Sequence, residues 1–171
     1  MAGWDEKEMK PIFKVLLCVC ALSVSGAGAA HAGPKEDAIA AYDKGDYKRA
    51  ARLFEPFAKA GDALSQFKLG FMYTNGDGVL QDYKEGMKWY RLSAEQGNAE
   101  AQNFLGGMYA NGQGVVRDNV YAYMWFNIAA SSGDANAVRN RDIVAKTMTA
   151  SQLEKAQDLA RECVKKNYKG C

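Results

Sequence analysis

The chain has 171 residues but only one histidine and four cysteines, and three of these five side chains (Cys18, Cys20 and His31) lie within the first 32 residues. Hydrolases with a serine or cysteine nucleophile normally use a neighbouring base such as histidine. A structural zinc site needs four cysteine or histidine ligands. We therefore expect no catalytic residues, no metal site and no cofactor in the remainder of the chain.

The chain also lacks an excess of charge of either sign. It has 22 Lys and Arg against 20 Asp and Glu, for a net charge of +2, so nothing draws it toward nucleic acid or acidic lipid. Hydrophobic residues make up 48% of the chain and charged residues 25%, which is typical of a globular protein. The length is consistent with one domain.

The apolar run near the N-terminus is short. It extends over residues 15–24, whereas a membrane-spanning helix needs about 20 residues. Lys10 and Lys14 precede it, and Ala30-His31-Ala32 follows as a small-residue cleavage pattern. The segment 1–32 is predicted to be a signal peptide, with Met9 as an alternative start and a periplasmic or secreted mature protein. An uncleaved interfacial or membrane anchor is the alternative.

Two stretches of the chain, 62–97 and 98–133, match without a gap at fourteen of 36 positions. Their shared frame reads A-x-x-Q-x-x-L-G-x-M-Y-x-N-G-x-G-V-x-x-D, followed by Trp, Ala and Gly. A period in this range predicts a stacked helical array. Each repeat is predicted to be a helix, a tight glycine loop and a second helix, because the paired glycines of the loop permit positive φ.

The helix boundaries recur with the same period. A glycine suited to a helix C-terminus precedes an Asp or Asn suited to cap the next helix, three times over. Gly70 and Gly106 recur inside the first helix of each repeat at a cost of about 1 kcal/mol each, which predicts that two backbones approach closely there. The glycine–cap pairs are Gly61-Asp62, Gly97-Asn98 and Gly133-Asp134, and the caps expected for the second helices are Asp46, Asp82 and Asp118.

The pattern changes after Gly133. A helix over 134–146 is followed by Thr149 and Gln152 in capping-box spacing and by a last helix to about residue 167. Its predicted inner face consists of Leu153, Ala156, Ala160 and Val164. The predicted organisation is therefore an N-terminal half repeat (33–61), repeat 1 (62–97), repeat 2 (98–133) and a C-terminal cap (134–171).

The motif AxxQxxLGxMYxNGxGVxxDxxxGxxWY, which starts at Ala63 and recurs in most positions from Ala99, resembles the Sel-one-like repeats. These are relatives of tetratricopeptide repeats. The resemblance implies an all-α, right-handed α-solenoid with a C-terminal helical cap and a concave, ligand-facing surface. It also implies an adaptor role, in bacteria often outside the cytoplasm.

Residues that differ between the repeats are the best candidates for partner contacts, because the shared ones are occupied by packing. Trp89, Trp125, Tyr73 and Tyr109 are accordingly assigned to the core rather than to a sugar-binding platform. The predicted partner-binding residues are Lys68, Phe71, Asn103 and Phe104. Tyr123 also differs between repeats, and Asn75, Asn111 and Asn127 are candidates for hydrogen bonds in the groove, with a turn role as the alternative for Asn75 and Asn111.

Ser65 and Lys68 match S-x-x-K, the nucleophile motif of serine penicillin-recognising enzymes. The two positions correspond to Ala101 and Phe104 in the next repeat, no S-D-N is present, and Lys146-Thr-Met lacks the glycine of K-T-G. We therefore expect this stretch to be partly exposed helix surface. An enzyme acting on cell-wall material or β-lactams through Ser65 and Lys68 remains an alternative.

The remaining cysteines, Cys163 and Cys171, are eight positions apart and can pair in an oxidising compartment. A disulfide is predicted, with free thiols or an intermolecular bond as alternatives. The function predicted for the whole chain is an exported, non-catalytic scaffold, monomeric and without a membrane span after cleavage, that binds a protein or peptide partner and no nucleic acid. The alternatives are the enzyme named above and a structural unit of an envelope assembly.

Overall fold

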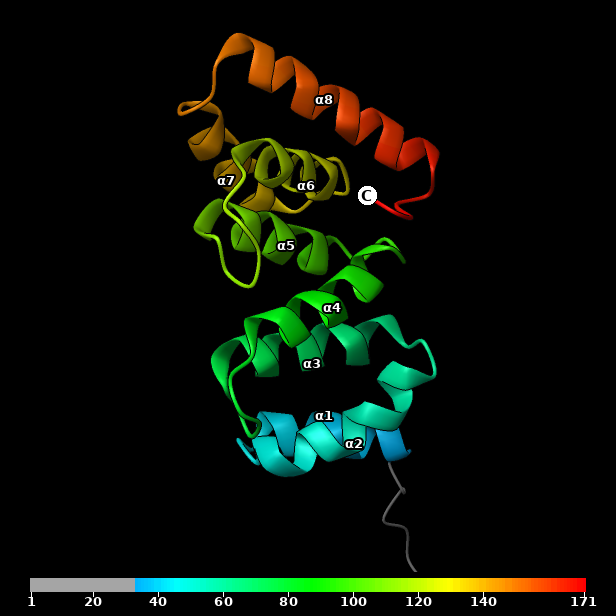
Figure 1. The fold of residues 1–171 in the computed structure, drawn as a ribbon. Helices are drawn as coiled ribbons and strands as arrows, with labels where there is room; N and C mark the ends of the chain where they lie inside the picture. The colour runs from blue at the N-terminus through cyan, green and yellow to red at the C-terminus, as the bar shows by residue number, and fades with distance from the viewer. Residues whose placement is uncertain (1–32) are drawn as a thin grey trace, which may run out of the picture. The chain divides into compact units, whose positions relative to one another are not determined.

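The computed structural model describes residues 33–171, which form eight α-helices and no strand (Figure 1). The predicted signal peptide, 1–32, lies outside the described residues. The helices are α1 (Pro34–Asp43), α2 (Tyr47–Lys59), α3 (Ala63–Asn75), α4 (Tyr83–Ala94), α5 (Ala99–Asn111), α6 (Asn119–Ser131), α7 (Ala135–Ala145) and α8 (Ala150–Lys165).

Each helix packs mainly against the helices before and after it in the chain, except that α8 packs against α6 rather than α7. Figure 1 shows the same order, with the helices following one another from α1 and α2 to α8. Packing mainly between neighbours is the mark of a repeat array, in which each unit buries its apolar face against the next. The predicted all-α solenoid is confirmed for residues 33–171.

The N-termini of the repeat helices are capped as the sequence predicts. At α2, α3, α4, α5, α6 and α7, an Asp or Asn side chain accepts a hydrogen bond from a first-turn N–H. At α8, Thr149 and Gln152 form both bonds of a capping box. Gly61, Gly97 and Gly133 have φ values of 98°, 84° and 94°, so the chain reverses at the positions that the repeat indicated.

The two recurring helix glycines lie under aromatic rings. A Cβ atom on Gly70 would fall 2.6 Å from the ring of Tyr90, and one on Gly106 would fall 2.6 Å from the ring of Phe126. Glycine at these two positions therefore leaves room for an aromatic ring of the second helix, and a side chain would not fit there. The predicted approach of two backbones is confirmed in repeat 1, where a Cβ atom on Gly86 of α4 would fall 3.0 Å from the carbonyl oxygen of Gly70.

The recurring aromatics pack in the core as predicted. Trp125 and Tyr109 are buried, whereas Trp89 and Tyr73 are half-buried against the core formed by α1, α2 and α3. The inner face predicted for the last helix is partly wrong. Val164 is 45% exposed, and Cys163 is buried at 2% exposure in its place.

The segment after α8 folds back toward repeat 1 and ends near it (Figure 1). The sulfurs of Cys163 and Cys171 lie at bonding distance, and their Cα atoms are 5.6 Å apart. Tyr168 has a φ of 66°, which costs a non-glycine residue about 1–2 kcal/mol. Its ring lies 3.5 Å from the Cβ position of Gly97, in the turn between α4 and α5. The end of the chain is thus held in a strained conformation against an earlier repeat.

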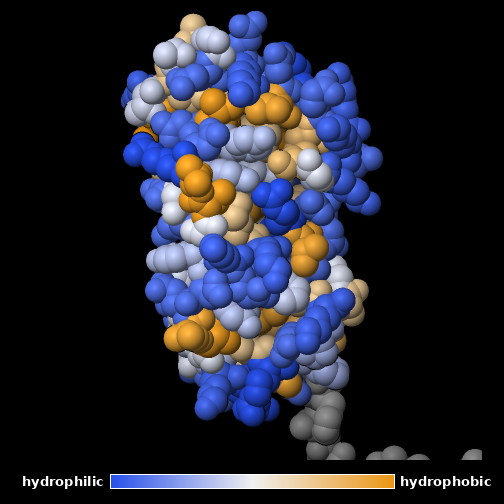
Figure 2. Space-filling model, in the orientation of Figure 1, coloured by the Kyte–Doolittle hydropathy of each residue, from blue (hydrophilic) through white to orange (hydrophobic). Residues whose placement is uncertain are grey.

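The face shown in Figure 2 is mostly hydrophilic, with its hydrophobic side chains in separate clusters. Within the described part of the chain, no helix combines the length and the hydrophobicity that crossing a membrane requires. The large hydrophobic side chains with substantial exposure are Leu80, Leu92, Phe104, Val116, Ile143 and Val164.

Candidate functional site

A groove of about 580 Å³, here called the Lys68 groove, is formed by the first helices of successive repeats. The side chains lining it come from α1, α3, α5 and the start of α7. All four residues predicted to bind a partner, Lys68, Phe71, Asn103 and Phe104, line this one groove. Its lining consists of Tyr42, Phe67, Lys68, Phe71, Ala99, Glu100, Asn103, Phe104, Ser132, Gly133, Asp134 and Asn136.

Phe104 is the centre of the aromatic part of this groove. Its ring stacks on that of Tyr90 with centroids 5.1 Å apart, and meets the rings of Phe67 and Phe71 edge-on at 5.6 and 5.9 Å. These arrangements are the ones that aromatic pairs prefer. Because Phe104 is still 38% exposed, part of a ring that is held firmly in place is available to a ligand.

Lys68 places a positive charge at one side of the groove. Its Nζ lies 4.3 Å from the centre of the Tyr42 ring, within the range of a cation–π contact. No carboxylate forms an ion pair with Lys68 among residues 33–171. Glu100 and Asp134 also line the groove, so charges of both signs are present.

A second groove of about 630 Å³, here called the amide groove, continues the first and shares Asn103, Phe104 and Asn136 with it. Carboxamide side chains predominate in it, and none of the described residues lining it is charged. Asn75 and Asn111, which the sequence suggested as groove residues, line the amide groove. The complete lining is Thr74, Asn75, Gln81, Tyr83, Tyr90, Asn103, Phe104, Gly107, Met108, Asn111, Gln113, Asn136 and Asn140.

Two of these amides join α5 to α7. Nδ2 of Asn140 donates a hydrogen bond to Oδ1 of Asn103 at 3.0 Å. An amide side chain has both a donor and an acceptor end, so Nδ2 of Asn103 and Oδ1 of Asn140 are left over. Neither has a hydrogen-bond partner within 33–171. Asn140 was missed from the sequence because it lies in the cap, where no second repeat copy exists for comparison.

Two other residues are not where the sequence placed them. Asn127 lines a separate cavity between α6 and α8, together with Ile128 and Val164. Tyr123 is buried in the core rather than available for contact. Both residues are on α6, the second helix of its repeat, and the two grooves are lined mainly by first helices. Divergence between repeats therefore identifies groove-lining residues only on the helices that face the groove.

Ser65 and Lys68 are not assembled as a nucleophile and base among the described residues. The expectation of a partly exposed Ser65 is wrong, because Ser65 has 0% exposure and its Oγ donates to Oδ2 of Asp62 at 2.6 Å. The Lys68 ammonium faces Tyr42 instead. Within 33–171 there is also no group of three or more His, Cys, Asp or Glu side chains placed to hold a metal ion.

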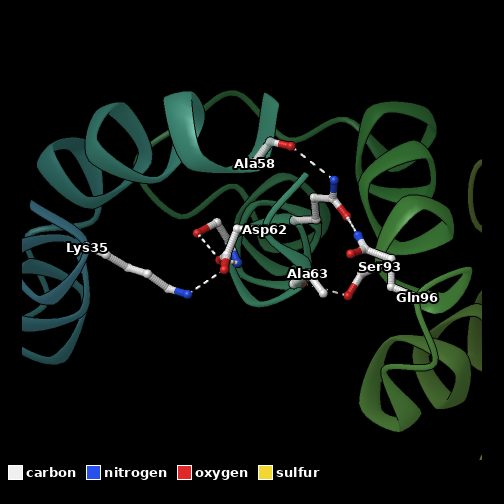
Figure 3. A network of polar contacts seen from close by, with 8 residues as sticks. Lys35, Ala58, Asp62, Ala63, Ser93 and Gln96 are labelled. Atoms are coloured by element: carbon white, nitrogen blue, oxygen red, sulfur yellow. Dashed lines mark hydrogen bonds and ion pairs between the residues drawn. The ribbon is translucent and has the colours of Figure 1, made fainter. Parts of the chain in front are cut away.

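Asp62 is the centre of a polar network at the N-terminus of α3 (Figure 3). It accepts hydrogen bonds from the backbone N–H and Oγ of Ser65 and forms an ion pair with Lys35 of α1. Burial acts to raise the pKa of this carboxyl, but the hydrogen bonds from Lys35 and Ser65 outweigh it and hold the pKa below its ordinary value. The ion pair joins the start of repeat 1 to α1, two helices earlier in the chain.

The recurring glutamine of the repeat frame has a structural role that the sequence did not reveal. Nε2 of Gln66 donates to the carbonyl of Ala58 at 3.0 Å, and Oε1 of Gln66 accepts from Nε2 of Gln96 at 2.7 Å (Figure 3). In repeat 2, Gln102 makes the same bond to Ala94, at 3.1 Å. Ser132 stands where Gln96 would be, and Oε1 of the buried Gln102 has no partner in the described part of the chain.

The comparison with protein families matches the Sel1 repeat to three consecutive segments, 40–62, 63–98 and 99–134. Together these segments cover more than half of the chain. The chain belongs to the Sel1 repeat family. The first match shows that α2 and the end of α1 belong to a Sel1 repeat as well.

Solved structures of Sel1 repeat proteins have the same fold. One is c5321, described as a protective antigen present in uropathogenic Escherichia coli strains and displaying an SLR fold. It is 31% identical, with a TM-score of 0.74 over 79% of this chain and 31% of its own length. A Sel1 repeat protein from Oxalobacter formigenes is 34% identical, with a TM-score of 0.52 over 53% of this chain and 26% of its own. The Sel1 repeat chain thus spans less than a third of either structure. No curated protein matches it in a sequence search.

Proposed function

We propose that this Sel1 repeat protein is an exported, non-catalytic scaffold that binds a protein or peptide partner in the continuous surface formed by the Lys68 groove and the amide groove. One observation carries the proposal. Lys68, Phe71, Asn103 and Phe104 differ between the repeats and line one groove, whereas the apolar residues that the repeats share are mostly in the core.

The Lys68 groove has the features of a peptide-recognition site. Phe104 supplies an exposed apolar surface that neighbouring rings hold in place, so little side-chain entropy is lost when a ligand covers it. Lys68 and Glu100 supply charges that favour one orientation of a ligand. A groove of this size holds a short helix or an extended segment.

The test is crosslinking from defined positions. The photoreactive amino acid benzoylphenylalanine replaces Phe104 in one variant and Leu92 in another. These side chains are 38% and 44% exposed, but Leu92 lies outside both grooves. Irradiation in envelope extract is expected to join position 104 to one predominant protein, and Lys68→Glu is expected to abolish that product. Equal products at both positions would contradict a partner bound in the groove.

The remaining parts of the proposal have their own measurements. Cell fractionation is expected to find the protein in the periplasm or the medium, with its N-terminus at Gly33. Size-exclusion chromatography over a hundredfold range of concentration is expected to give a monomer at every point. A dimer or larger assembly would favour the structural role in an envelope complex. Intact mass spectrometry after incubation with a labelled β-lactam is expected to show no adduct, because the Ser65 hydroxyl is buried against Asp62.

A further inference from the structure

The amide groove has a chemistry of its own, distinct from that of the Lys68 groove. The described residues lining it carry no charge, and amide side chains come from α3, α5, α7 and the loops after α3 and α5. We propose that this half of the groove recognises the backbone of an extended peptide segment whose side chains are uncharged. The inference rests on the proposed function and names the ligand chemistry for half of that site.

The pair Asn103 and Asn140 matches one peptide unit. Their mutual hydrogen bond uses one donor and one acceptor and leaves Nδ2 of Asn103 and Oδ1 of Asn140 for a ligand. A peptide unit offers one C=O and one N–H. A peptide crossing between α5 and α7 satisfies both amide ends, because its carbonyl accepts from Asn103 and its N–H donates to Asn140.

Further amides continue this arrangement along α5. Asn111 is eight residues after Asn103, which corresponds to about 12 Å of helix. That distance equals about three to four residues of extended chain. The side chains of Asn111 and Gln113 make no hydrogen bond within the described residues, and Asn75 donates only a long one of 3.5 Å to Asp77. Several amide groups are therefore available along a segment of this length.

Gly107 provides the space that a bound backbone needs. A Cβ atom on Gly107 would meet no atom within 4 Å, whereas the glycine next to it, Gly106, lies under the ring of Phe126. Packing therefore does not require glycine at position 107. The same position of repeat 1 is Phe71, whose side chain lines the Lys68 groove. Glycine at 107 keeps the surface of the amide groove low, so that a chain can approach α5 closely.

The absence of charge determines which side chains the segment carries. Moving an ionised side chain out of water is costly unless an opposite charge or several hydrogen bonds receive it, and none of the described residues lining the amide groove is ionised. Charged residues of the partner are accommodated only at the Lys68 end. A saccharide can also bond to amides, although Tyr90 covers one face of the Phe104 ring, so the test below includes cell-wall oligosaccharides as competing ligands.

The test uses a phage-displayed library of random 12-residue peptides, selected on the purified protein with its cysteines oxidised. Enriched peptides are expected to share an uncharged segment of about three to four residues, the length that the amide groove spans. Synthetic copies are then measured by calorimetry. Methylation of one backbone nitrogen in that segment is expected to weaken binding at least about tenfold, while alanine at the same position changes it less than about threefold. This contrast is the signature of backbone recognition, because each methyl group removes one donor.

Two variants of the protein separate this inference from the proposed function. Gly107→Phe copies the residue of repeat 1 and is expected to weaken binding at least about tenfold, whereas Leu92→Phe, which places the same side chain outside both grooves, is the matched control and retains binding within about threefold. Denaturation curves verify that both variants fold. If Lys68→Ala abolishes binding while Gly107→Phe and backbone methylation do not, the scaffold function stands and the inference is wrong. If no peptide is selected and cell-wall oligosaccharides bind instead, both are wrong.

Discussion

A Cβ atom on Gly106 would lie 2.6 Å from the ring of Phe126, and Gly70 has the same relation to Tyr90 one repeat earlier. Real Cβ atoms do not come so close to a ring. These contacts set how closely the two helices of each repeat pack. The packing of α3 and α5, which line the groove, therefore depends on glycine at these two positions.

The adjacent glycines of α5 are predicted to respond to alanine in opposite directions. Gly106→Ala forces the helices apart and is expected to lower the free energy of unfolding by about 1–2 kcal/mol, since overpacking exceeds the gain in helix propensity. The new methyl group of Gly107→Ala meets open space, and this variant is expected to raise the free energy of unfolding by up to about 1 kcal/mol. Urea denaturation of both variants measures the difference. A change of the same sign in the free energy of unfolding of both variants would show that the Phe126 contact does not constrain the helix pair.

The Asp62 network is predicted to make stability dependent on pH. The pKa of Asp62 is lowered in the folded protein, so its contribution is present above the unfolded pKa of about 3.9 and is lost as the pH falls through the folded pKa. Asp62→Asn keeps a helix cap, as Asn98 does in repeat 2, but loses the ion pair with Lys35. The difference in Tm between wild type and this variant is expected to be largest near pH 7 and to shrink below pH 4. A difference that stays constant over this range would mean that the carboxylate charge contributes nothing.

The two recurring glutamines are predicted to differ in their contribution to stability. Gln66 satisfies both ends of its amide, whereas Gln102 has an unpaired oxygen in the described structure. Gln66→Leu is therefore expected to cost about 2 kcal/mol. Gln102→Leu is expected to cost about 1 kcal/mol or less, because it also removes a buried unsatisfied group. Denaturation in guanidinium measures both. Equal losses would indicate that the hydrogen bond from Gln96 is without net effect.

Loss of the predicted disulfide is expected to loosen the C-terminal segment. The double variant with Cys163→Ser and Cys171→Ser opens the loop between two cysteines that are eight positions apart. Closing a loop of this length contributes roughly 2–3 kcal/mol in the chain-entropy model. The double variant also leaves Tyr168 free to relax from its positive φ. Mass spectrometry with a thiol reagent tests for the bond. Hydrogen exchange is expected to show faster exchange at the end of α8 in the variant and an unchanged rate in α3. Reactive thiols in the purified wild-type protein would contradict the pairing.

Much of the fold was predictable, because the same helix-boundary signals occur in more than one repeat. Gly97 and Asn98, for example, predict the end of one helix and the start of the next in adjacent positions, and the structure has both there. Which side chains of α8 face the core was not predictable, since this helix has no second copy in the chain. The cysteine pairing and the return of the chain toward Gly97 place Cys163 inward, and Val164 is turned out.

The location of the candidate site was partly predictable for the same reason. Comparison of two repeats separates packing residues from variable ones, and it led to Lys68 and Phe104, which do line one groove. It could not show that Ser65 is buried, because this depends on Asp62 and on Lys35 of another helix. The amide groove was predicted only in part, since Asn75, Asn103 and Asn111 were named from the sequence but Gln113 and Asn140 join them only after folding.

The most direct test of the account follows the side-chain amide resonances of asparagine and glutamine by NMR while a selected peptide or the crosslinked partner segment is added. The central claim is that the ligand lies across α3, α5 and α7. The Nδ2 signals of Asn103 and Asn140 are expected to shift most, while those of Asn127, in the cavity beside α8, are expected to stay unchanged. Shifts confined to Asn127 and the α8 surface, with Asn103 and Asn140 unaffected, would contradict it.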